Sequence, residues 1–188
     1  ERFRVPLSPL PLAPRYNIAP SQPVPVVVKR EESERELAEM VWGLVPHWAR
    51  DPAAAGRAIN ARAETLEDRP TFRDPFHHHR CLVPASGFYE WRKEGKSREP
   101  SYIHRKDDGL FAIAGLYDIW RGPAEEEIRS FTIVTTEPNS LVSHYHDRMP
   151  AILRQDDEET WLSPARLTQQ KVQEILSPYP AEFLEAVK

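Results

Sequence analysis

Proline content constrains the fold of this chain more strongly than any other feature of its sequence. The 188 residues include 19 prolines but only 7 glycines, and the proline content is roughly twice the usual ~5%. Proline lacks a backbone N–H donor and disfavours a helical conformation in the residue before it. We therefore expect many short extended segments with rigid connections, and few long helices.

Segments rich in β-branched or alternating apolar residues predict most of the secondary structure. They lie at residues 23–29, 37–44, 59–63, 81–83, 87–92, 102–105, 110–116 and 129–135. An Asp-Gly pair at residues 108–109 predicts a hairpin between two of them, because this pair suits the positive φ of such turns. The best helix candidates are residues 155–161 and 165–176.

The prolines at positions 70 and 75 are expected to break residues 65–76 into short helical pieces. The histidines that follow, His77, His78 and His79, are expected in a surface loop. Consecutive side chains point in different directions, so these three do not converge easily on one metal ion. Taken together, the segments predict one β-rich α+β domain over residues 1–188, with mostly antiparallel strands.

The formal net charge of −4 has the wrong sign for a generic nucleic-acid binder. Binding to phosphates requires only a local basic stripe, however, and the acidic residues cluster at residues 31–39, 125–127 and 156–159. We expect these acidic runs to lie away from any such stripe. No run of about 18 apolar residues occurs, so no membrane partner is expected.

The single cysteine, Cys81, cannot form a disulfide within the chain. This composition fits a reducing compartment, so a cytoplasmic location is expected, associated with the nucleoid if the source is bacterial. Cys81 lies between Arg80 and Leu82 in a predicted strand. Its expected role is that of a small buried hydrophobic residue.

Two polar groups of residues stand in predicted strands. Asn60, Arg62 and Glu64 alternate with alanines, so an amide, a guanidinium and a carboxylate share one face. This row is either a binding site or a solvated sheet face, and spacing alone favours the solvated face. Glu90 lies among aromatic residues, where its pKa is expected to rise in a way that suits proton transfer. A surface glutamate on an amphipathic strand is an equally weighted alternative.

A third polar group, His144, His146, Asp147 and Arg148, follows a predicted strand. Loops at strand ends often carry function, and histidine titrates near neutral pH. A metal site is the rival interpretation, but the sequence has no HExxH or CxxC pattern, so we expect no metal and no cofactor. Trp48 is either an exposed stacking platform for a nucleobase or a core residue.

Six motifs, in this order, resemble the SRAP (SOS response-associated peptidase) family. They are RYNIAP (15–20), WGLVPHW (42–48), INARAET (59–65), RCLVPASGFYEW (80–91), FTIVTTEPN (131–139) and YHDRMP (145–150). The resemblance covers about residues 15–161, and the combination of INARAET, GFYEW and HDRMP is its most specific part. It implies a mixed fold built on a distorted, barrel-like sheet, with a positively charged groove for single-stranded DNA.

The family carries an N-terminal cysteine that joins covalently to the ring-opened sugar of an abasic site, and its peptidase label reflects removal of the residues before that cysteine. By resemblance, Asn60 orients the cysteine amine or the sugar, Glu90 is the acid and base, and His146 protonates the sugar oxygen. Arg62 and Arg148 would hold flanking phosphates. The other positions expected at the DNA are Asn17, Pro20, Trp48, Trp91 and Thr135.

The sequence thus predicts a monomer that binds abasic sites in single-stranded DNA. It would form a thiazolidine crosslink through a cysteine upstream of Glu1 and process its own N-terminus. One alternative is a non-covalent single-stranded DNA-binding module without the nucleophile. A third and weaker hypothesis is a stand-alone hydrolase that uses Glu90 and His146.

Overall fold

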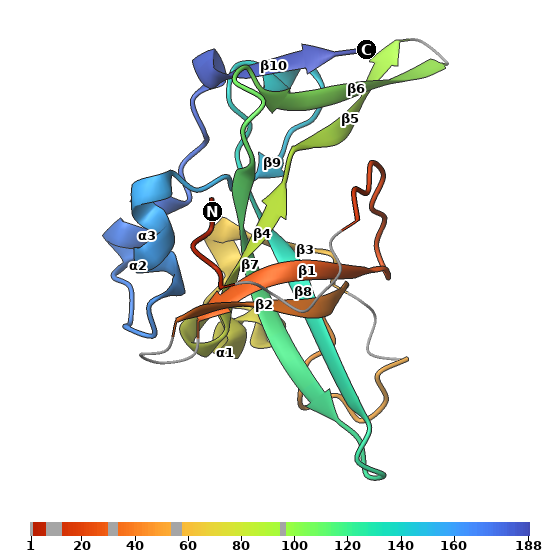
Figure 1. Ribbon diagram of the computed structural model, residues 1–188, viewed down its shortest axis with the longest axis vertical. Helices are drawn as coiled ribbons and strands as arrows, with labels where there is room; N and C mark the ends of the chain where they lie inside the picture. The colour runs from red at the N-terminus through yellow and green to blue at the C-terminus, as the bar shows by residue number, and fades with distance from the viewer. Residues whose placement is uncertain (1, 7–12, 30–33, 54–57, 95–96) are drawn as a thin grey trace.

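Two β-sheets meet toward one end of the molecule (Figure 1). The computed structural model describes residues 2–6, 13–29, 34–53, 58–94 and 97–188. Within these residues, the larger sheet has seven strands in the order β2-β1-β4-β7-β8-β3, with β9 paired to β8. The smaller sheet has the order β10-β6-β5.

The alternating segments form these strands much as their patterns predict. The strands of the larger sheet are β1 (Pro23–Lys29), β2 (Arg35–Trp42), β3 (Asn60–Arg62), β4 (Arg80–Ala85), β7 (Phe111–Arg121), β8 (Glu127–Thr136) and β9 (Met149–Pro150). Those of the smaller sheet are β5 (Gly87–Glu94), β6 (Ser97–Arg105) and β10 (Leu184–Val187). The prediction of a β-rich α+β fold is confirmed.

The larger sheet curls back on itself at β8, without forming a regular closed barrel. β2 pairs with β8 at Trp42, opposite Phe131, and β3 pairs with it from Asn60, opposite Ile133. Both pairings are parallel, whereas the other strand pairs are antiparallel. Gly43 takes a φ of 124° where the chain leaves the sheet after β2. The described residues 43–53 and 58–59 therefore form an excursion between two strands that share one edge of β8.

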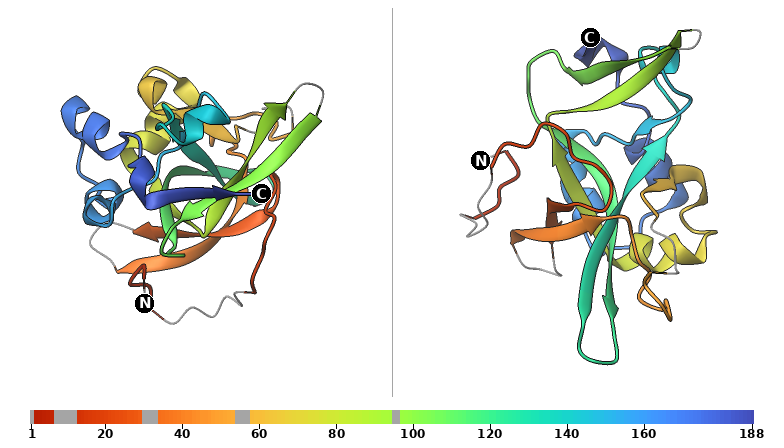
Figure 2. Two further views of the ribbon diagram at one scale, coloured as in Figure 1. Left: turned by 90° about the horizontal axis from the view of Figure 1, so that it is seen from above. Right: turned by 90° about the vertical axis from the view of Figure 1, so that its right-hand side faces the viewer.

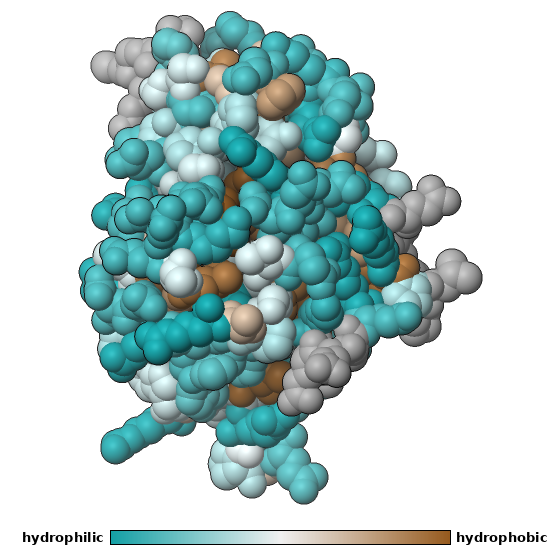
Figure 3. Space-filling model, turned by 90° about the vertical axis from the view of Figure 1, so that its left-hand side faces the viewer, coloured by the Kyte–Doolittle hydropathy of each residue, from teal (hydrophilic) through white to brown (hydrophobic). Residues whose placement is uncertain are grey.

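Short helices cover one side of the larger sheet (Figures 1 and 2). They are α1 (Pro70–His78), α2 (Glu158–Leu162) and α3 (Gln169–Ile175). The described residues also form the 3-10 turns η1 (Ala63–Thr65), η2 (Val142–His144), η3 (Gln155–Asp157) and η4 (Ala181–Phe183), and η4 leads directly into β10 of the smaller sheet. The face over α2 and α3 is mainly hydrophilic, with apolar residues visible only in crevices (Figure 3). No helix in the described part of the chain is long and apolar enough to cross a membrane.

Side-chain alternation along the strands separates two apolar clusters. Val27, Leu82 and Val134 face the first cluster, which also contains Phe76 of α1 and Trp161 of α2. Residues that alternate with them face the second cluster: Val26, Val28, Cys81, Val83 and Phe131. Ile103 and Leu184 of the smaller sheet belong to the same cluster. The larger sheet is therefore buried on both faces over most of its length, and the two sheets share a core.

A buried ion-pair network ties the start of the described chain to α2. Glu158 is almost fully buried and pairs with both Arg2 and Arg35. Arg35 also donates to the backbone oxygen of Phe3, whose ring is buried in the first cluster. A buried carboxylate requires such partners, because an unpaired one would carry a large desolvation cost. Residues 2–6 are thus held on the body of the protein.

The predicted hairpin around residues 108–109 is wrong. β6 pairs with β5 and β10, whereas β7 pairs with β4 and β8, so the two segments belong to different sheets. Asp108 does take a positive φ of 53°, as the turn chemistry predicts. β7 is buried along nearly its whole length, and pairing in the middle of the larger sheet outweighs the local turn signal.

The expectation for the segment before β4 is also wrong. Pro70 begins α1 rather than breaking it, because a proline at the first helical position loses no hydrogen bond. Pro75 lies inside the helix, where its burial beside Phe76 offsets the lost backbone donor. His77 and His78 therefore occupy the last helical turn instead of a surface loop, and His79 caps the helix.

Glycine is required at position 87, where the chain passes from the larger sheet to the smaller one. A Cβ atom there would lie 2.5 Å from the Tyr102 ring and 2.6 Å from the Ile103 backbone oxygen. We expect Gly87→Ala to lower the free energy of unfolding by about 1–3 kcal/mol, as overpacking does. Gly109→Ala is the control, since its Cβ would meet only mobile side-chain ends at 3.0–3.2 Å. Equal denaturation midpoints for the two variants would contradict this reading.

Candidate functional site

Strand β3 presents its polar residues outward because its central residue is fully buried. Ala61 packs in the first cluster, so Asn60 and Arg62 lie exposed on the opposite face. The parallel register places Asn60 opposite Ile133 and Arg62 opposite Thr135 of β8. The small alanine between them allows this close approach. Asn60, Arg62 and Thr135 thus lie on two neighbouring strands.

β9 approaches β8 at the same place. Thr135 lies opposite Pro150, and the backbone N–H of Ala151 donates to the Val134 oxygen at 2.8 Å. Thr135 is therefore flanked by β3 and by β9. The residues just before β9, which include His146 and Arg148, are carried by this pairing toward Arg62.

The Arg148 guanidinium holds these segments together. It donates to both carboxylate oxygens of Glu64, at 2.8 and 2.9 Å, and to the Thr135 backbone oxygen at 2.7 Å. These hydrogen bonds from Arg148 hold the pKa of Glu64 below its ordinary value. Such bidentate arginine–carboxylate pairs are among the stronger polar contacts in proteins.

The ring of His146 is oriented by the backbone of Arg148. The Arg148 N–H donates to His146 Nδ1 at 2.9 Å. A backbone N–H can only donate, so Nδ1 is the acceptor in this hydrogen bond. Asp147 Oδ1 lies 3.1 Å from the same nitrogen, and the Arg148 oxygen lies 3.2 Å from it. Either oxygen can accept a hydrogen bond from Nδ1 when that nitrogen carries a proton.

Glu90 enters the site from β5 of the smaller sheet. Its carboxyl is half-buried, and burial raises its pKa above the ordinary value. The positive form of His146 counteracts this rise, and the charge of Asp147 adds to it, so Glu90 lies within electrostatic range of both. The pair consists of a carboxyl that retains its proton more readily than usual and a histidine, which is a combination suited to proton transfer.

The structure therefore gathers most of the catalytic and phosphate-binding residues that were expected from the sequence. Glu90, His146, Arg148, Thr135 and Arg62 lie at the junction of the two sheets. Asn60 shares a face with Arg62, but no contact joins it to Glu90 or His146 within the described residues. Arg62 makes no ion pair with a described residue, so it is the more available cation of the two arginines.

The expected DNA-groove residues are spread more widely. Asn17 and Pro20 are exposed in the segment before β1, which Arg15 fixes by donating to Gln22 Oε1 at 2.6 Å. Trp91 is 51% exposed on β5, and in a regular strand it faces away from Glu90. Trp48 is 56% exposed in the excursion between β2 and β3. The interpretation of Trp48 as a core residue is wrong.

Asp118 is a site-supporting residue that the sequence analysis missed. Its buried carboxylate accepts from the His47 backbone N–H at 2.8 Å and lies 2.9 Å from His47 Nδ1. It thus fixes the residue next to Trp48. The available signal was a single acid within the apolar run of β7, residues 111–121.

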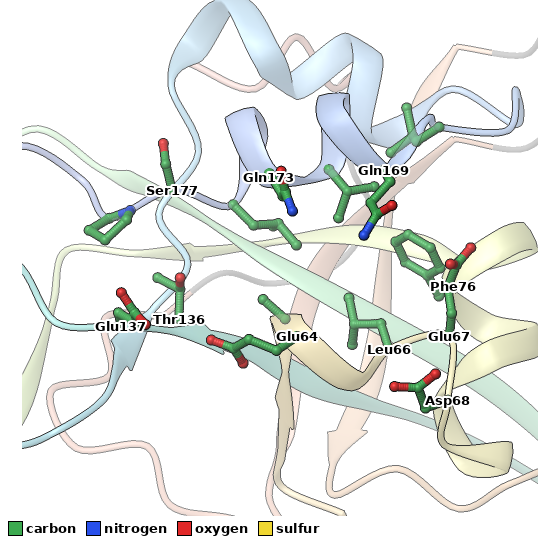
Figure 4. Close-up of a pocket in the computed structure, with 15 residues that line it drawn as sticks. Glu64, Leu66, Glu67, Asp68, Phe76, Thr136, Glu137, Gln169, Gln173 and Ser177 are labelled. Atoms are coloured by element: carbon green, nitrogen blue, oxygen red, sulfur yellow. The ribbon is translucent and has the colours of Figure 1, made fainter.

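A cavity of about 590 Å³ lies beside the site and was not predicted (Figure 4). Glu64, Thr136 and Glu137 lie at one end of it, and Glu67 and Asp68 lie at the other, near Phe76 (Figure 4). Residues of α3 line the opposite wall. The described residues that line it include four carboxylates and neither lysine nor arginine. Acidic residues thus lie closer to Arg148 than the positions of the acidic runs suggested.

Cys81 is buried in the second cluster, and burial raises the pKa of its thiol well above the ordinary value. It is therefore a poor nucleophile in the folded protein. Within the described residues, no group of three or more histidine, cysteine or acidic side chains is arranged to hold a metal ion.

Comparison with known proteins assigns this chain to one family. The profile of the SOS response associated peptidase (SRAP) family matches residues 2–188, and the chain belongs to that family. The abasic site processing protein YoqW of Bacillus subtilis is 42% identical over 174 residues, which cover 92% of this chain and 77% of the relative. The abasic site processing protein HMCES of Gallus gallus is 32% identical, over 88% of this chain and 58% of the relative.

Solved structures agree with this assignment. A crystal structure of a protein from Bacteroides thetaiotaomicron has a TM-score of 0.81 and 38% sequence identity, over 88% of this chain and 73% of that chain. A protein from Bordetella bronchiseptica has a TM-score of 0.79 and 30% identity, over 91% of this chain and 86% of that chain.

The burial of Glu90 leads to a prediction about stability and pH. Because the folded-state pKa of Glu90 is raised, its contribution to stability is fully present below the ordinary glutamate pKa and falls as pH rises through the raised value. Glutamine has no charge to desolvate. We therefore expect Glu90→Gln to raise the unfolding midpoint at neutral pH, and this advantage to disappear near about pH 4.

Thermal unfolding followed by circular dichroism across this pH range measures the effect. Glu182→Gln, at an exposed glutamate of η4, serves as the control and should differ little from the wild type at any pH. A Glu90→Gln variant that is less stable than the wild type at neutral pH would show that the carboxylate is stabilised by its surroundings.

Proposed function

We propose that this chain is the body of a protein that binds abasic sites in single-stranded DNA and crosslinks to them through an N-terminal cysteine upstream of Glu1. The same site would serve in removal of the residues before that cysteine. The observation that carries the proposal is the junction of the two sheets, where a half-buried Glu90 with a raised pKa lies within electrostatic range of His146. Membership of the SRAP family and the names of the relatives support it.

The proposed chemistry needs an amine, a thiol and proton transfer at one carbon. A ring-opened abasic sugar is an aldehyde. The cysteine amine adds to it, water leaves, and the thiol closes on the resulting Schiff base to give a thiazolidine, so one water is released overall. Glu90 moves the protons of the amine and of the departing water, and His146 donates to the sugar oxygen from Nε2. Asn60 orients the amine or the sugar.

The two arginines would then have different roles. Arg62 is exposed and has no ion pair with a described residue, so it is suited to a phosphate next to the lesion. The Arg148 guanidinium already donates hydrogen bonds to Glu64 and Thr135, so it is less available to bind a phosphate. The exposed Trp48 and Trp91 are suited to stacking on unpaired bases. Asn17, Pro20 and Thr135 would complete the path of the strand.

A non-covalent binding module is the second candidate, and the burial of Cys81 is the observation that favours it. Cys81 lies within the chain, so it offers a thiol without a free amine. A Schiff base to a lysine hydrolyses in water unless it is reduced.

Adduct formation distinguishes the two candidates. We expect a full-length form that begins with cysteine to give a heat-stable adduct with abasic single-stranded DNA, whereas the chain that starts at Glu1 binds reversibly. Cys81→Ala should leave the adduct yield unchanged, because the buried thiol takes no part. Intact-mass spectrometry and peptide mapping measure both. A crosslink mapped to Cys81, or a stable adduct of the Glu1-started chain, would overturn the proposal.

Salt dependence tests the phosphate contacts separately. Each phosphate contact to a single strand contributes a slope of roughly −0.7 in log K against log salt. We expect Arg62→Gln to reduce the slope for abasic DNA by about that amount. Arg121→Gln is the control, since Arg121 lies at the far end of β7 and pairs with Glu127 at 3.2 Å. Fluorescence anisotropy over a salt series measures both, and equal slopes for the two variants would contradict the assignment of Arg62.

A further inference from the structure

The strongest polar contact of the site involves a residue to which no role in the reaction has been given. Glu64 lies in η1, directly after β3, and it accepts two hydrogen bonds from Arg148 across 84 residues of sequence. The Arg148 side chain is only 18% exposed, and its Nε has no partner within the described residues. The guanidinium is therefore held inside the protein by Glu64 and Thr135 alone.

This pair anchors the side chain of Arg148, whose backbone lies between β9 and His146. On one side, Arg148 is followed directly by β9, which pairs with β8. On the other side, its own N–H donates to His146 Nδ1. A shift of the Arg148 backbone would lengthen that hydrogen bond, and with it the restraint on the imidazole would be lost. The contacts form one chain, from Glu64 through the Arg148 guanidinium and backbone to the ring of His146.

We propose that Glu64 is a positioning residue, which holds the ring of His146 in the orientation that the reaction uses. This inference rests on the proposed function for its chemical consequence, but its structural part stands alone. Without Glu64, a largely buried guanidinium would keep one carbonyl partner and its orphaned Nε, so it would turn toward solvent to regain hydrogen bonds. His146 would then lose the hydrogen bond from the Arg148 N–H that orients its ring.

Glu64 does not compete with a DNA phosphate for Arg62. Both of its oxygens face Arg148. Its interaction with Arg62 is electrostatic only, and it lowers the pKa of Glu64 less than the hydrogen bonds from Arg148 do. A phosphate on the exposed Arg62 therefore leaves the Glu64–Arg148 pair intact. The expected effect of losing Glu64 is a slower reaction of bound DNA, with binding little changed.

Amide hydrogen exchange of Arg148 tests the structural part without any DNA. We expect Glu64→Ala to increase the exchange rate of the Arg148 N–H by at least about tenfold, because the acceptor at His146 Nδ1 is no longer held in place. Glu64→Gln should give a smaller increase, since its amide oxygen can still accept one hydrogen bond. Glu67→Ala is the matched control, because Glu67 lines the other end of the same cavity and pairs with His77 at 3.7 Å.

Single-turnover adduct formation tests the chemical part in the full-length form that begins with cysteine. The rate at saturating abasic DNA should fall by about 10–100-fold in Glu64→Ala, as losses of outer-shell partners do elsewhere, while the half-saturating DNA concentration stays within about twofold. Glu64→Gln should recover part of the rate. Glu67→Ala should match the wild type in both quantities.

The outcomes separate the two proposals. An unchanged Arg148 exchange rate in Glu64→Ala overturns the positioning role, whether or not an adduct forms. An unchanged saturating rate with weaker DNA binding also overturns it, because Glu64 would then act on affinity. If the wild type forms no adduct but the exchange rate responds as expected, the proposed function fails and the positioning of His146 by Glu64 stands. If Glu64→Ala does not fold, Glu64→Gln decides by the same two measurements.

Discussion

The pairing of β8 with four other strands is the interaction on which the rest of this structure depends. β7 lies along one of its edges, while β2 and β3 follow each other in parallel along the other. Near its end, β9 also pairs with it, at Thr135 and Thr136. Because β3 brings Arg62 and β9 brings Arg148 to the same threonine, a site is assembled from segments far apart in the sequence. A change in the register of β8 would separate all of these groups.

Charged groups of the site are partly buried, which costs desolvation energy, and hydrogen-bond partners offset this cost for one of them. Burial raises the pKa of Glu90, so the charged form of its carboxyl is disfavoured. Arg148, in contrast, is stabilised by a carboxylate and a carbonyl, and it fixes the surroundings of His146. The site thus combines a carboxyl whose pKa is raised by burial with an arginine–glutamate pair whose charges are matched.

Local patterns in the sequence were sufficient for most strands and for the outward row of Asn60 and Arg62, because alternation reports directly on which face is buried. They failed where a distant partner decides the outcome. The Asp-Gly pair at residues 108–109 predicts a hairpin, yet the burial of β7 in the larger sheet places its two flanks in different sheets. The parallel pairing of β3 and the bond from Glu64 to Arg148 are invisible to spacing, since they join residues 73–84 positions apart. The motifs of the family indicated which residues belong together, but the fold alone shows how they are held.

The most direct test of the central claim is to map where abasic DNA contacts this chain. Tetrahydrofuran is a stable analogue of the abasic sugar that cannot form a crosslink, so it reports on the site without the upstream cysteine. Amide chemical shifts of the Glu1-started chain would be recorded with a single strand that contains the analogue and with the same strand undamaged. The account predicts that the differences between the two titrations concentrate at Asn60, Arg62, Glu90 and His146. Identical shifts for both strands, or differences confined to the far end of the β7–β8 hairpin, would contradict it.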